Sequence, residues 1–402
     1  MTVKQRLGDI VKLTSGGTPS KKNVDYWGGD IPWISAKNMK DEFLSDSSIH
    51  ITKEGLNHGS RLAPEGSLLL LVRGSGLFND IPICYVERDV AFNQDVKCIE
   101  SIEPEKLPNK YIFYWLKSQK YALSQSVGVT TIGAGKFDTD YILNMEIPIP
   151  SIEVIEKLVT FFDALTQKIR CNTKINDNLL QQISAIFRYW FTDNPEVDSM
   201  TQVPLADLCA VVTKGTTPTT LGKPFVSEGI NFIKAESIQD NHSIDKNKFA
   251  YIDDETNSLL KRSIISAGDI VFTIAGSLGR FAIVDDSVLP ANTNQAVAII
   301  RADERKVTPE YLYSFFLGNW HNDYYTKRIQ QAVQANLSLG TIKSLPIPVL
   351  SDQKMLEYLG LITPLIAMTK SNEQEITRLE QVRDTLLPRL MSGELDVSSL
   401  DI

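Results

Sequence analysis

The feature that most constrains the fold is an internal duplication of the chain. The segment LGDIVKLTSGGTP, which begins at Leu7, returns as LADLCAVVTKGTTP from Leu205. Further matches follow in the same order: Ile31–Met39 with Ile230–Ile238, Arg61–Ser75 with Arg262–Ser277, Ala91–Val96 with Asn292–Val297, and Glu146–Ser151 with Ser344–Ser351. The offset between matched segments stays between 198 and 202 positions. Because order and spacing are both kept, the sequence predicts one structural unit of about 200 residues that occurs twice.

Each copy begins with short runs of β-branched and aromatic residues. Examples are SLLLLVRGSG (67–76) and DIVFTIAGSLG (269–279), which are bounded by Gly, Pro and Asn as strands usually are. One helical segment, NKYIFYWLKSQKYAL (109–123), interrupts the strands. The predicted fold class is therefore α+β, with mixed, strand-rich globular domains at 1–150 and 205–350.

A long helix follows each globular domain. The IPIP and LPIP prolines close the sheet, and Ser151 and Ser351 are suitable N-caps, each with an acidic residue in the next turn. We expect helices over 151–191 and 351–391. Apolar residues at alternating steps of four and three predict a coiled-coil seam with a polar centre. The seam residues are Leu158, Phe162, Leu165, Ile169, Asn172, Asn176, Leu179, Ile183, Ile186 and Trp190 in the first helix, and Ile362, Leu365, Asn372, Ile376, Leu379 and Leu386 in the second.

The length of the linker indicates how the two helices pair. The first seam spans roughly 50 Å at about 1.5 Å per residue. The linker over 192–204 reaches at most about 45 Å when fully extended. Parallel helices would need the linker to run back along the whole coil, whereas antiparallel helices need only a short connection. The sequence therefore predicts an antiparallel coiled coil with a globular unit at each end, a pseudo-two-fold relation between the halves, and a short tail at 392–402.

Composition and charge leave the partner of the chain open. The 402 residues carry a net charge of −8. Residues 1–150 hold 17 basic and 18 acidic side chains, 201–350 hold 14 and 15, and 351–402 hold 5 and 9. Each large segment is thus nearly neutral and could still present one basic face to nucleic acid. The scattered cysteines, the missing signal peptide and the short apolar runs predict a cytoplasmic protein with no membrane association.

Motifs for catalysis are missing from the sequence. The four histidines have no metal-ligand spacing, and IGAGKF (132–137) lacks both the first Gly and the hydroxyl residue of a phosphate-binding loop. No nucleophile elbow or dinucleotide fingerprint occurs. We therefore predict no catalytic residue and no metal site, although an unfamiliar carboxylate site stays open as an alternative.

Six segments together resemble the specificity subunit of type I restriction–modification systems. They are LGDIVKLTSGGTPS, GDIPWISAKNM, GSLLLLVRGSG, EIPIPS, the helix end IFRYWF (186–191) and the C-terminal LLPRLMSGELDV (386–397). The resemblance implies two target recognition domains that each read half of a bipartite, asymmetric double-stranded DNA target. It implies that the paired helices set the spacer and dock two methyltransferase subunits, with restriction subunits outside. S-adenosylmethionine would bind the methyltransferases, so no cofactor is expected on this chain.

Side chains suited to DNA contact can be proposed in both halves. Phosphates bind Lys, Arg and small hydroxyls, whereas base edges bind Arg, Asn, Gln or Lys. The candidates are Lys21, Lys22, Lys37, Arg73, Thr130, Thr131 and Lys136 in the first half, and Lys214, Lys223, Lys234, Arg280, Gln334 and Asn336 in the second. Asn93-Gln94 and Asn294-Gln295 recur unchanged, which favours a structural role. A free-standing DNA-modifying enzyme and a tandem binding protein for another ligand are the alternative functions.

Overall fold

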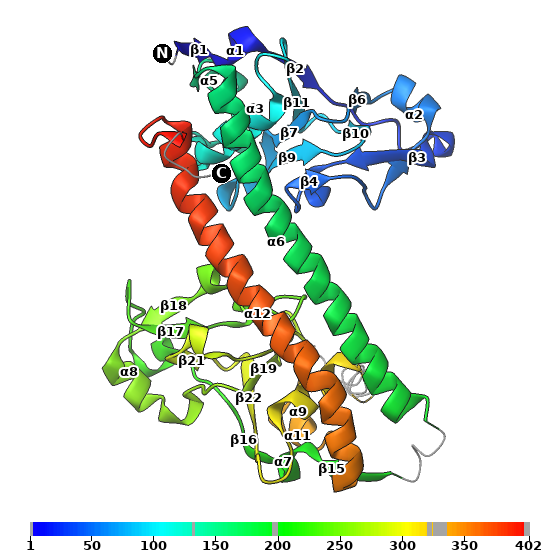
Figure 1. Cartoon of the computed structure of the whole chain (residues 1–402), viewed down its shortest axis with the longest axis vertical. Coiled ribbons are helices and arrows are strands. Elements are labelled where there is room, and N and C mark those ends of the chain that lie inside the picture. The colour runs from blue at the N-terminus through cyan, green and yellow to red at the C-terminus, as the bar shows by residue number, and fades with distance from the viewer. Residues whose placement is uncertain (1–2, 131–132, 195–199, 320–323, 325–335, 398–402) are drawn as a thin grey trace. The chain divides into compact units, whose positions relative to one another are not determined.

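The computed structural model describes residues 3–130, 133–194, 200–319, 324 and 336–397. These residues form two compact units (Figure 1). Unit 1 contains the described residues up to Ile169 and those from Arg378 onward, and unit 2 contains those from Arg170 to Thr377. Each unit therefore includes one globular segment and a part of both long helices. The sequence boundaries 1–150 and 205–350, the linker and the tail stay predictions.

The core of unit 1 is a five-stranded sheet with the order β2-β11-β7-β9-β4. Its strands are β2 Val11–Ser15, β11 Val96–Ser101, β7 Leu68–Leu71, β9 Ile83–Val86 and β4 Phe43–Leu44. All four leucines of β7 are buried, as a central strand covered on both faces requires. A second sheet has the order β5-β3-β10-β6, formed by β5 His50–Ile51, β3 Trp27–Ile34, β10 Val90–Phe92 and β6 Arg61–Ala63.

Unit 2 repeats this plan with fewer strands. Its first sheet has the order β16-β22-β19-β20, formed by β16 Cys209–Lys214, β22 Val297–Ala302, β19 Ile270–Thr273 and β20 Phe281–Ile283. Its second sheet has the order β18-β17-β21, formed by β18 Ala250–Ile252, β17 Ile230–Ile233 and β21 Ala291–Thr293. In both units the second sheet contains a parallel strand pair, β3 with β10 and β17 with β21. The mixed α+β fold predicted from the sequence is confirmed.

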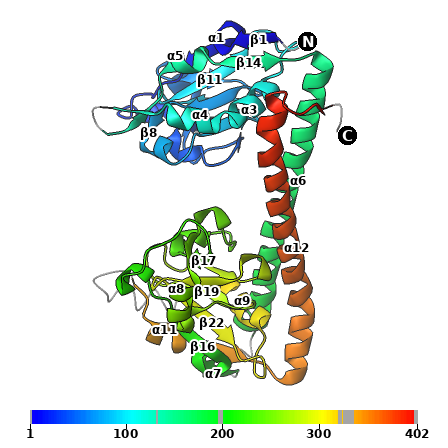
Figure 2. The ribbon, with the colours of Figure 1, turned by 90° about the vertical axis from the view of Figure 1, so that its left-hand side faces the viewer.

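One helix covers the first sheet of each unit. In unit 1, α3 (Asn109–Ser118) lies beside the long helices (Figure 2). Phe113 packs on Tyr85 of β9, and Tyr114 donates a hydrogen bond to Asp163 of the first long helix at 2.7 Å, so α3 lies between β9 and that helix. The single helix predicted over 109–123 was wrong. The backbone of Gln119 leaves helical geometry, and α4 (Lys120–Gln125) begins after it. The adjacent Ser118 hydroxyl donates to the carbonyl of Trp115, which is local competition with the helix ladder.

The prolines that close each globular segment lie inside a two-stranded ribbon. Strand β1 (Val3–Arg6) pairs with β14 (Glu146–Ile149), and β15 (Thr201–Pro204) pairs with β23 (Pro346–Val349). Proline is tolerated there because each strand of a two-stranded ribbon has one free edge. The ribbon is also tied to the covering helix. Tyr111 donates its hydroxyl to the carbonyl of Pro148 at 2.6 Å, and Tyr311 of α9 (Pro309–Leu317) makes the same bond to Pro348.

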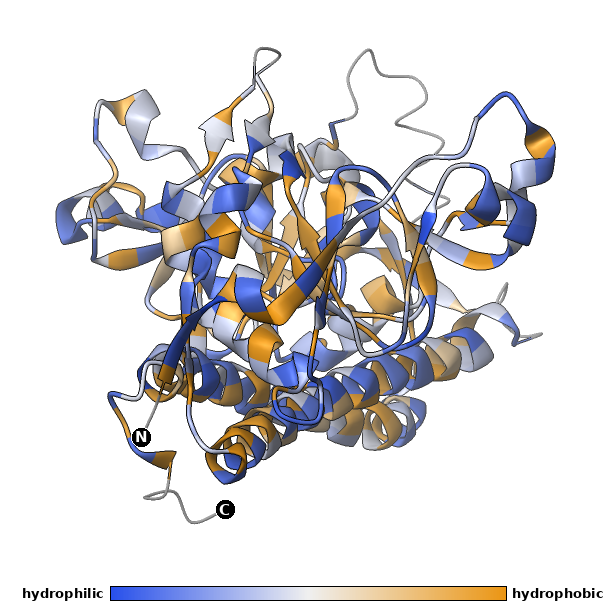
Figure 3. Ribbon diagram, turned by 90° about the horizontal axis from the view of Figure 1, so that it is seen from above, coloured by the Kyte–Doolittle hydropathy of each residue, from blue (hydrophilic) through white to orange (hydrophobic). Residues whose placement is uncertain are grey.

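The long helices are α6 (Ile152–Phe187) and α12 (Asp352–Met391), which begin directly after Ser151 and Ser351. In unit 1 the start of α6 packs with the end of α12, since Leu158 and Phe162 share one core with Leu387 and Leu390. In unit 2 the end of α6 packs with the start of α12, through Ile183 and Phe187 with Tyr358 and Ile362. The helices are therefore antiparallel within each unit. Figure 3 shows hydrophobic residues in the strands and in stripes along these helices.

The predicted seam residues differ in burial between the two helices. In α6, Leu158, Phe162, Ile169, Asn172, Asn176, Leu179 and Ile183 are buried, and Leu165 and Ile186 are half-buried. Trp190 is also half-buried but lies after α6, in the π-helical turn Arg188–Thr192. In α12 only Ile362 is buried, whereas Leu365, Asn372, Ile376, Leu379 and Leu386 are half-buried. Buried positions outside the seam, such as Thr166 and Phe187, face the globular segments: Tyr114 contacts Thr166, and Phe315 packs on Phe187. Each long helix thus buries a wider stripe than a two-stranded coil needs.

Polar side chains in unit 2 fix the register of the two helices. Asn372 donates a hydrogen bond to Asn176 at 2.8 Å, and Asn176 donates to the carbonyl of Thr369 at 3.2 Å. Asn172 donates to Glu375 at 2.6 Å. A slip of the helices by one turn would leave the buried amides of Asn172 and Asn176 without partners, which costs about 1–3 kcal/mol for each group. The polar centre therefore specifies one alignment.

Candidate nucleic-acid interface

Several loops of each unit emerge at the same edge of its first sheet. In unit 1, β11 starts where β2 and β7 end, since Lys97 lies opposite Ser15 and Val96 lies opposite Leu71. The residues just before β11, Asn93–Asp95, form the Asn-Gln turn of unit 1, and Asn294–Ala296 form the turn of unit 2. Strand β3 also ends here, because the amide of Asn93 donates to the carbonyl of Ile34 at 3.0 Å. We use the name Asn-Gln edge for this turn together with three neighbouring loops. In unit 1 these loops follow β2, β3 and β7, and in unit 2 they follow β16, β17 and β19.

The repeated Gly-Thr-Pro turn packs directly on the Asn-Gln turn. A Cβ atom on Gly16 would lie less than 3.0 Å from the carbonyl oxygens of Phe92 and Asn93, so only glycine permits this approach. The Thr18 hydroxyl donates to Oε1 of Gln94 at 2.6 Å. Unit 2 has the same arrangement: a Cβ on Gly215 would overlap the carbonyl of Thr293, and the amide of Thr217 donates to Gln295 at 3.1 Å.

Side-chain amides complete this shared structure. Asn93 accepts the amide of Asp95, and Asn294 accepts the amide of Ala296, each at 3.1 Å. The Asn-Gln pairs therefore hold the turn in both units, a role that does not distinguish one DNA sequence from another.

Most first-half candidates lie exposed on the Asn-Gln edge of unit 1. Lys21 and Lys22 belong to the loop after β2, and Lys37 belongs to the 3-10 turn Ala36–Asn38 after β3. Arg73 lies on β8 (Arg73–Gly74), directly after β7, and pairs with Lys136 of β13 (Gly135–Lys136). Among the residues that the structure describes, none of these five cations forms an ion pair.

The hairpin that carries Lys136 has its own polar bracing. Strand β13 also pairs with β12 (Gly128–Val129), and the half-buried Thr130 accepts the amide of Ala134 at 3.0 Å. Thr130 is thus occupied within the hairpin rather than presented outward. Thr131 lies outside the described residues.

Two indoles hold the lysine-bearing loop of unit 1. Trp33 donates its ring N–H to the carbonyl of Gly17 at 3.1 Å, and Trp27 donates to the carbonyl of Ser20 at 3.2 Å. Their rings meet edge to face at 5.4 Å. This role was not predicted from the sequence, although GDIPWISAKNM places Trp33 where unit 2 has Phe232, which has no ring donor.

The cations on the Asn-Gln edge of unit 2 are mostly paired with acids. Lys223 contacts Glu255 at 2.7 Å, and their hydrogen bond raises the pKa of Lys223. Lys234 contacts Glu236 at 2.7 Å. Arg280 makes a two-pronged contact with Asp240 at 2.6 and 2.8 Å. The two units therefore present different electrostatics on the same backbone plan.

The remaining second-half candidates follow the pattern of unit 1. Lys214 is the last residue of β16 and is half-buried. Asn336 is exposed beside Leu337, whose amide donates to the carbonyl of Ile274 at 2.9 Å. In unit 1 the amide of Phe137 makes the equivalent bond to Val72, so Asn336 occupies the position of Lys136. Gln334 lies outside the described residues.

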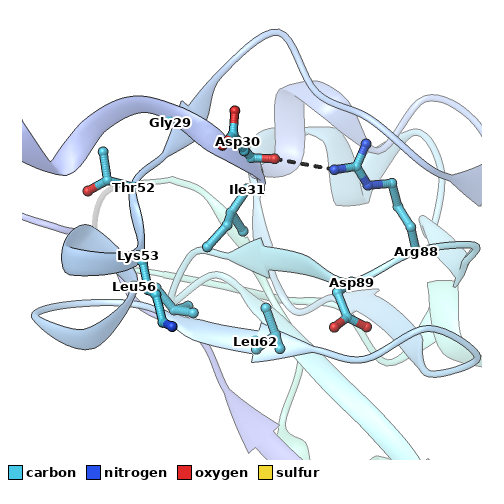
Figure 4. A pocket seen from close by; sticks show the side chains of 9 residues that line it. All are labelled: Gly29, Asp30, Ile31, Thr52, Lys53, Leu56, Leu62, Arg88 and Asp89. Carbon is cyan, nitrogen blue, oxygen red and sulfur yellow. Dashed lines mark hydrogen bonds between the residues drawn. The ribbon is translucent and has the colours of Figure 1, made fainter.

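A separate pocket of about 700 Å³ lies at the opposite end of β10 from the Asn-Gln turn of unit 1 (Figure 4). Its walls carry two acids and two bases, Asp30, Asp89, Lys53 and Arg88. Arg88 donates to the backbone carbonyl of Asp30 at 3.2 Å. The mixed charge of these walls favours neither an anionic nor a cationic ligand.

Within the described residues, no group of three or more His, Cys, Asp or Glu side chains could hold a metal ion. Among the helices that the structure describes, none is long and apolar enough to cross a membrane.

Comparison with known proteins identifies the family. The family model for the type I restriction modification DNA specificity domain matches residues 2–181 and again 198–381. The chain is 26% identical to the type I restriction enzyme MjaIX specificity subunit of Methanocaldococcus jannaschii, in an alignment covering 98% of this chain and 94% of that protein. It is 33% identical to the EcoR124I/EcoR124II specificity subunit of Escherichia coli, over 40% of this chain and 41% of that protein.

A solved structure has the same fold. The crystal structure of the S subunit of a type I restriction-modification system from M. genitalium matches with a TM-score of 0.55 at 15% identity, over 97% of this chain and 96% of that one. The family model matches twice, once in each half, and its two matches leave out only the first residue, the inter-repeat residues 182–197 and the end of the chain. The chain belongs to the family of type I restriction–modification DNA specificity domains.

Proposed function

We propose that this chain is the DNA specificity subunit of a type I restriction–modification complex, and that units 1 and 2 each read one half of a split DNA target. The observation that carries this proposal is the Asn-Gln edge. Both units build it with the same Gly-Thr-Pro and Asn-Gln contacts, yet its exposed side chains differ from one unit to the other. A constant backbone with variable side chains suits two modules that bind the same polymer at different sequences, so the full target should be asymmetric.

The side chains at the edge supply both kinds of DNA contact. In unit 1, Lys21, Lys22 and Lys37 are exposed cations suited to phosphates, which fix position but carry no sequence information. In unit 2, the two hydrogen bonds to Asp240 fix the orientation of the Arg280 guanidinium. A guanidinium in a fixed orientation can donate to the two acceptors, O6 and N7, of a guanine edge. Asn336 could read adenine in the same manner.

The long helices would serve as the scaffold of the complex. Each helix contributes to both units, and exposed apolar residues such as Leu361 and Met368 of α12 are available to partner subunits. We infer that two methyltransferase subunits dock on this surface, with restriction subunits outside them. The chain itself would be non-catalytic, and S-adenosylmethionine would bind the methyltransferases.

Methylome sequencing tests this function directly. Cells that carry the complete system should show N6-methyladenine at one split motif, and deletion of this gene should remove that methylation alone. Exchange of residues 205–350 for those of a relative should change one half of the motif, and exchange of 1–150 should change the other half. The motif retained in each exchange is the internal control. An unchanged methylome after deletion of the gene would refute the proposal, and a change in both halves after one exchange would refute the assignment of one half-site to each unit.

A further inference from the structure

One loop on the Asn-Gln edge of unit 1 exposes an aromatic ring. The connection from β7 to β9 contains eleven residues (72–82), whereas the equivalent connection from β19 to β20 contains seven (274–280). The longer loop includes the 3-10 turn Ser75–Phe78. Phe78 is 52% exposed at the end of this turn, while the neighbouring Leu77 is 1% exposed and belongs to the core.

The loop that carries Phe78 is firmly braced. Leu77 packs against Gly135 of β13, where an added Cβ would lie 3.0 Å from the leucine side chain. The amides of Asn79 and Asp80 both donate to the carbonyl of Gly76, at 2.9 and 3.1 Å. Lys120 of α4 binds Asp80 at 3.0 Å. A loop whose backbone is held by this many contacts loses little conformational entropy when a partner covers it, which favours binding.

Two cations accompany Phe78, one within this loop and one on the neighbouring strand β13. Arg73 and Lys136 lie directly opposite each other on the antiparallel strands β8 and β13, and Gly135 beside Lys136 is the residue that packs on Leu77. Like charges at opposed positions destabilise a strand pair. Neither cation forms an ion pair within the described part of the chain. The site therefore combines an exposed ring with two like charges that a polyanion would neutralise.

We propose that Phe78 is a DNA-contacting residue of unit 1 that stacks on, or inserts between, bases of its half-site, while Arg73 and Lys136 bind the flanking phosphates. The occupant is double-stranded DNA because the patch pairs an aromatic ring with unneutralised positive charge, the combination that binds bases and backbone together. Unit 2 has only the half-buried Leu278 in its shorter loop, so this contact belongs to one half-site. The inference rests on the proposed function and adds a specificity-determining residue to it.

The test uses this chain assembled with its methyltransferase partners and duplexes that carry the motif defined by methylome sequencing. Phe78→Ala should weaken binding by about 5- to 150-fold, the effect of losing one base–aromatic stack. Its salt dependence should stay unchanged, because no charge is removed. Arg73→Ala should instead lower the slope of log affinity against log salt by about 1. Phe78→Trp, which keeps a ring, should restore binding.

Tyr141→Ala is the matched control, because Tyr141 is 42% exposed on α5 (Thr139–Leu143) of the same unit. Leu143 of α5 lies beside Gly8, at the start of β2 rather than at its Asn-Gln end. The Tyr141→Ala variant should bind DNA like the wild type. Duplexes with 2-aminopurine at successive positions of the half-site of unit 1 should gain fluorescence at one step with wild type and lose that gain with Phe78→Ala. Equal affinity and equal fluorescence for the two proteins would overturn the proposal.

Two further outcomes separate this proposal from the function on which it rests. If Phe78→Ala fails to assemble with the methyltransferases in size-exclusion chromatography, the patch is a subunit interface and the DNA contact is refuted. If the wild-type complex does not prefer the motif duplex over a scrambled one, the proposed function itself fails. Wild-type preference together with an unaffected Phe78→Ala variant would refute only the role of Phe78.

Discussion

Replacing Gly16 by alanine should destabilise unit 1 by about 2 kcal/mol. The new Cβ would lie less than 3.0 Å from the carbonyl oxygens of Phe92 and Asn93, so the turn must move back by roughly 1 Å to reach an ordinary contact near 3.5 Å. That movement stretches two hydrogen bonds, from the amide of Gly17 to Phe92 at 2.9 Å and from Thr18 to Gln94 at 2.6 Å. Each such bond contributes about 1 kcal/mol to stability.

A Gly→Ala substitution should have the opposite effect on stability in a long helix. Gly360 lies within α12 and is exposed, and apart from its own turn of helix no atom of the described residues lies within 4 Å of an added Cβ. Gly360→Ala should therefore stabilise the helix by about 0.5–1 kcal/mol, because alanine has the higher helix propensity. Gly215→Ala, which creates the equivalent overlap with Thr293, should destabilise unit 2 rather than unit 1.

Hydrogen exchange followed by mass spectrometry measures these effects separately in each unit. Peptides that cover β11 should lose protection in Gly16→Ala, whereas peptides that cover β22 should lose it in Gly215→Ala. If Gly16→Ala leaves β11 fully protected while Gly360→Ala stabilises α12, the close approach of the two turns does not hold the edge together, and the argument for the repeated glycine is wrong.

Three further changes test the polar centre, one half-buried carboxyl and the tryptophan contacts. Asn176→Leu should lower the free energy of unfolding of unit 2 by about 1–3 kcal/mol in urea, because Asn372 loses its acceptor. The double variant Asn176→Leu, Asn372→Leu should regain most of that stability. If the losses of the two single variants simply add in the double variant, the pair is not coupled. Burial, aided by the charge of Asp285, raises the pKa of Glu373 to about 7 from 4.5. Between pH 4.5 and about 7 the folded state therefore binds more protons than the unfolded state, so stability falls as pH rises through this range. Glu373→Gln should be more stable than the wild type by up to about 3 kcal/mol at pH 8, and by little at pH 4. Trp33→Phe removes the bond to Gly17, which should cost unit 1 about 1 kcal/mol in urea unfolding. Because the loop that carries Lys21 and Lys22 loses this support, duplex binding by the assembled complex should weaken about fivefold.

The sequence was sufficient for the architecture because the repeated residues make the repeated contacts. Gly16 and Gly215 stand out as matched glycines, and each proves to be the point where one turn touches another. The helix starts at Ser151 and Ser351 followed from capping chemistry, and the antiparallel pairing followed from the reach of the linker. Local rules of this kind depend on neighbours in the chain, which a sequence displays.

The electrostatics of the candidate site depend on distant neighbours and could not be predicted in this way. Arg280 pairs with Asp240 across 40 positions, and Lys223 pairs with Glu255 across 32. Asp240 comes from the loop after β17 and Glu255 from α8 (Asp254–Leu259), so the approach of both acids depends on the tertiary fold. Phe78 was missed because an exposed phenylalanine has the same sequence signal as a buried one. Only its burial, set against that of Leu77, distinguishes the two.

The difference in charge between the two edges has a consequence for how each half-site would be bound. Cations such as Lys21 and Arg73, which form no ion pair within the described residues, attract phosphates by releasing counterions, so their contribution falls as salt rises. Arg280 and Lys223 already have acidic partners, which cancel much of that attraction but hold the cationic groups in fixed directions. A fixed guanidinium discriminates by geometry, because its fork matches one base edge better than another. We therefore expect charge-removing substitutions on the edge of unit 1 to reduce the salt slope of binding. Arg280→Lys should leave the slope nearly unchanged and relax the choice of base in the half-site of unit 2. A slope that responds equally to changes in both units would contradict this division between attraction and geometry.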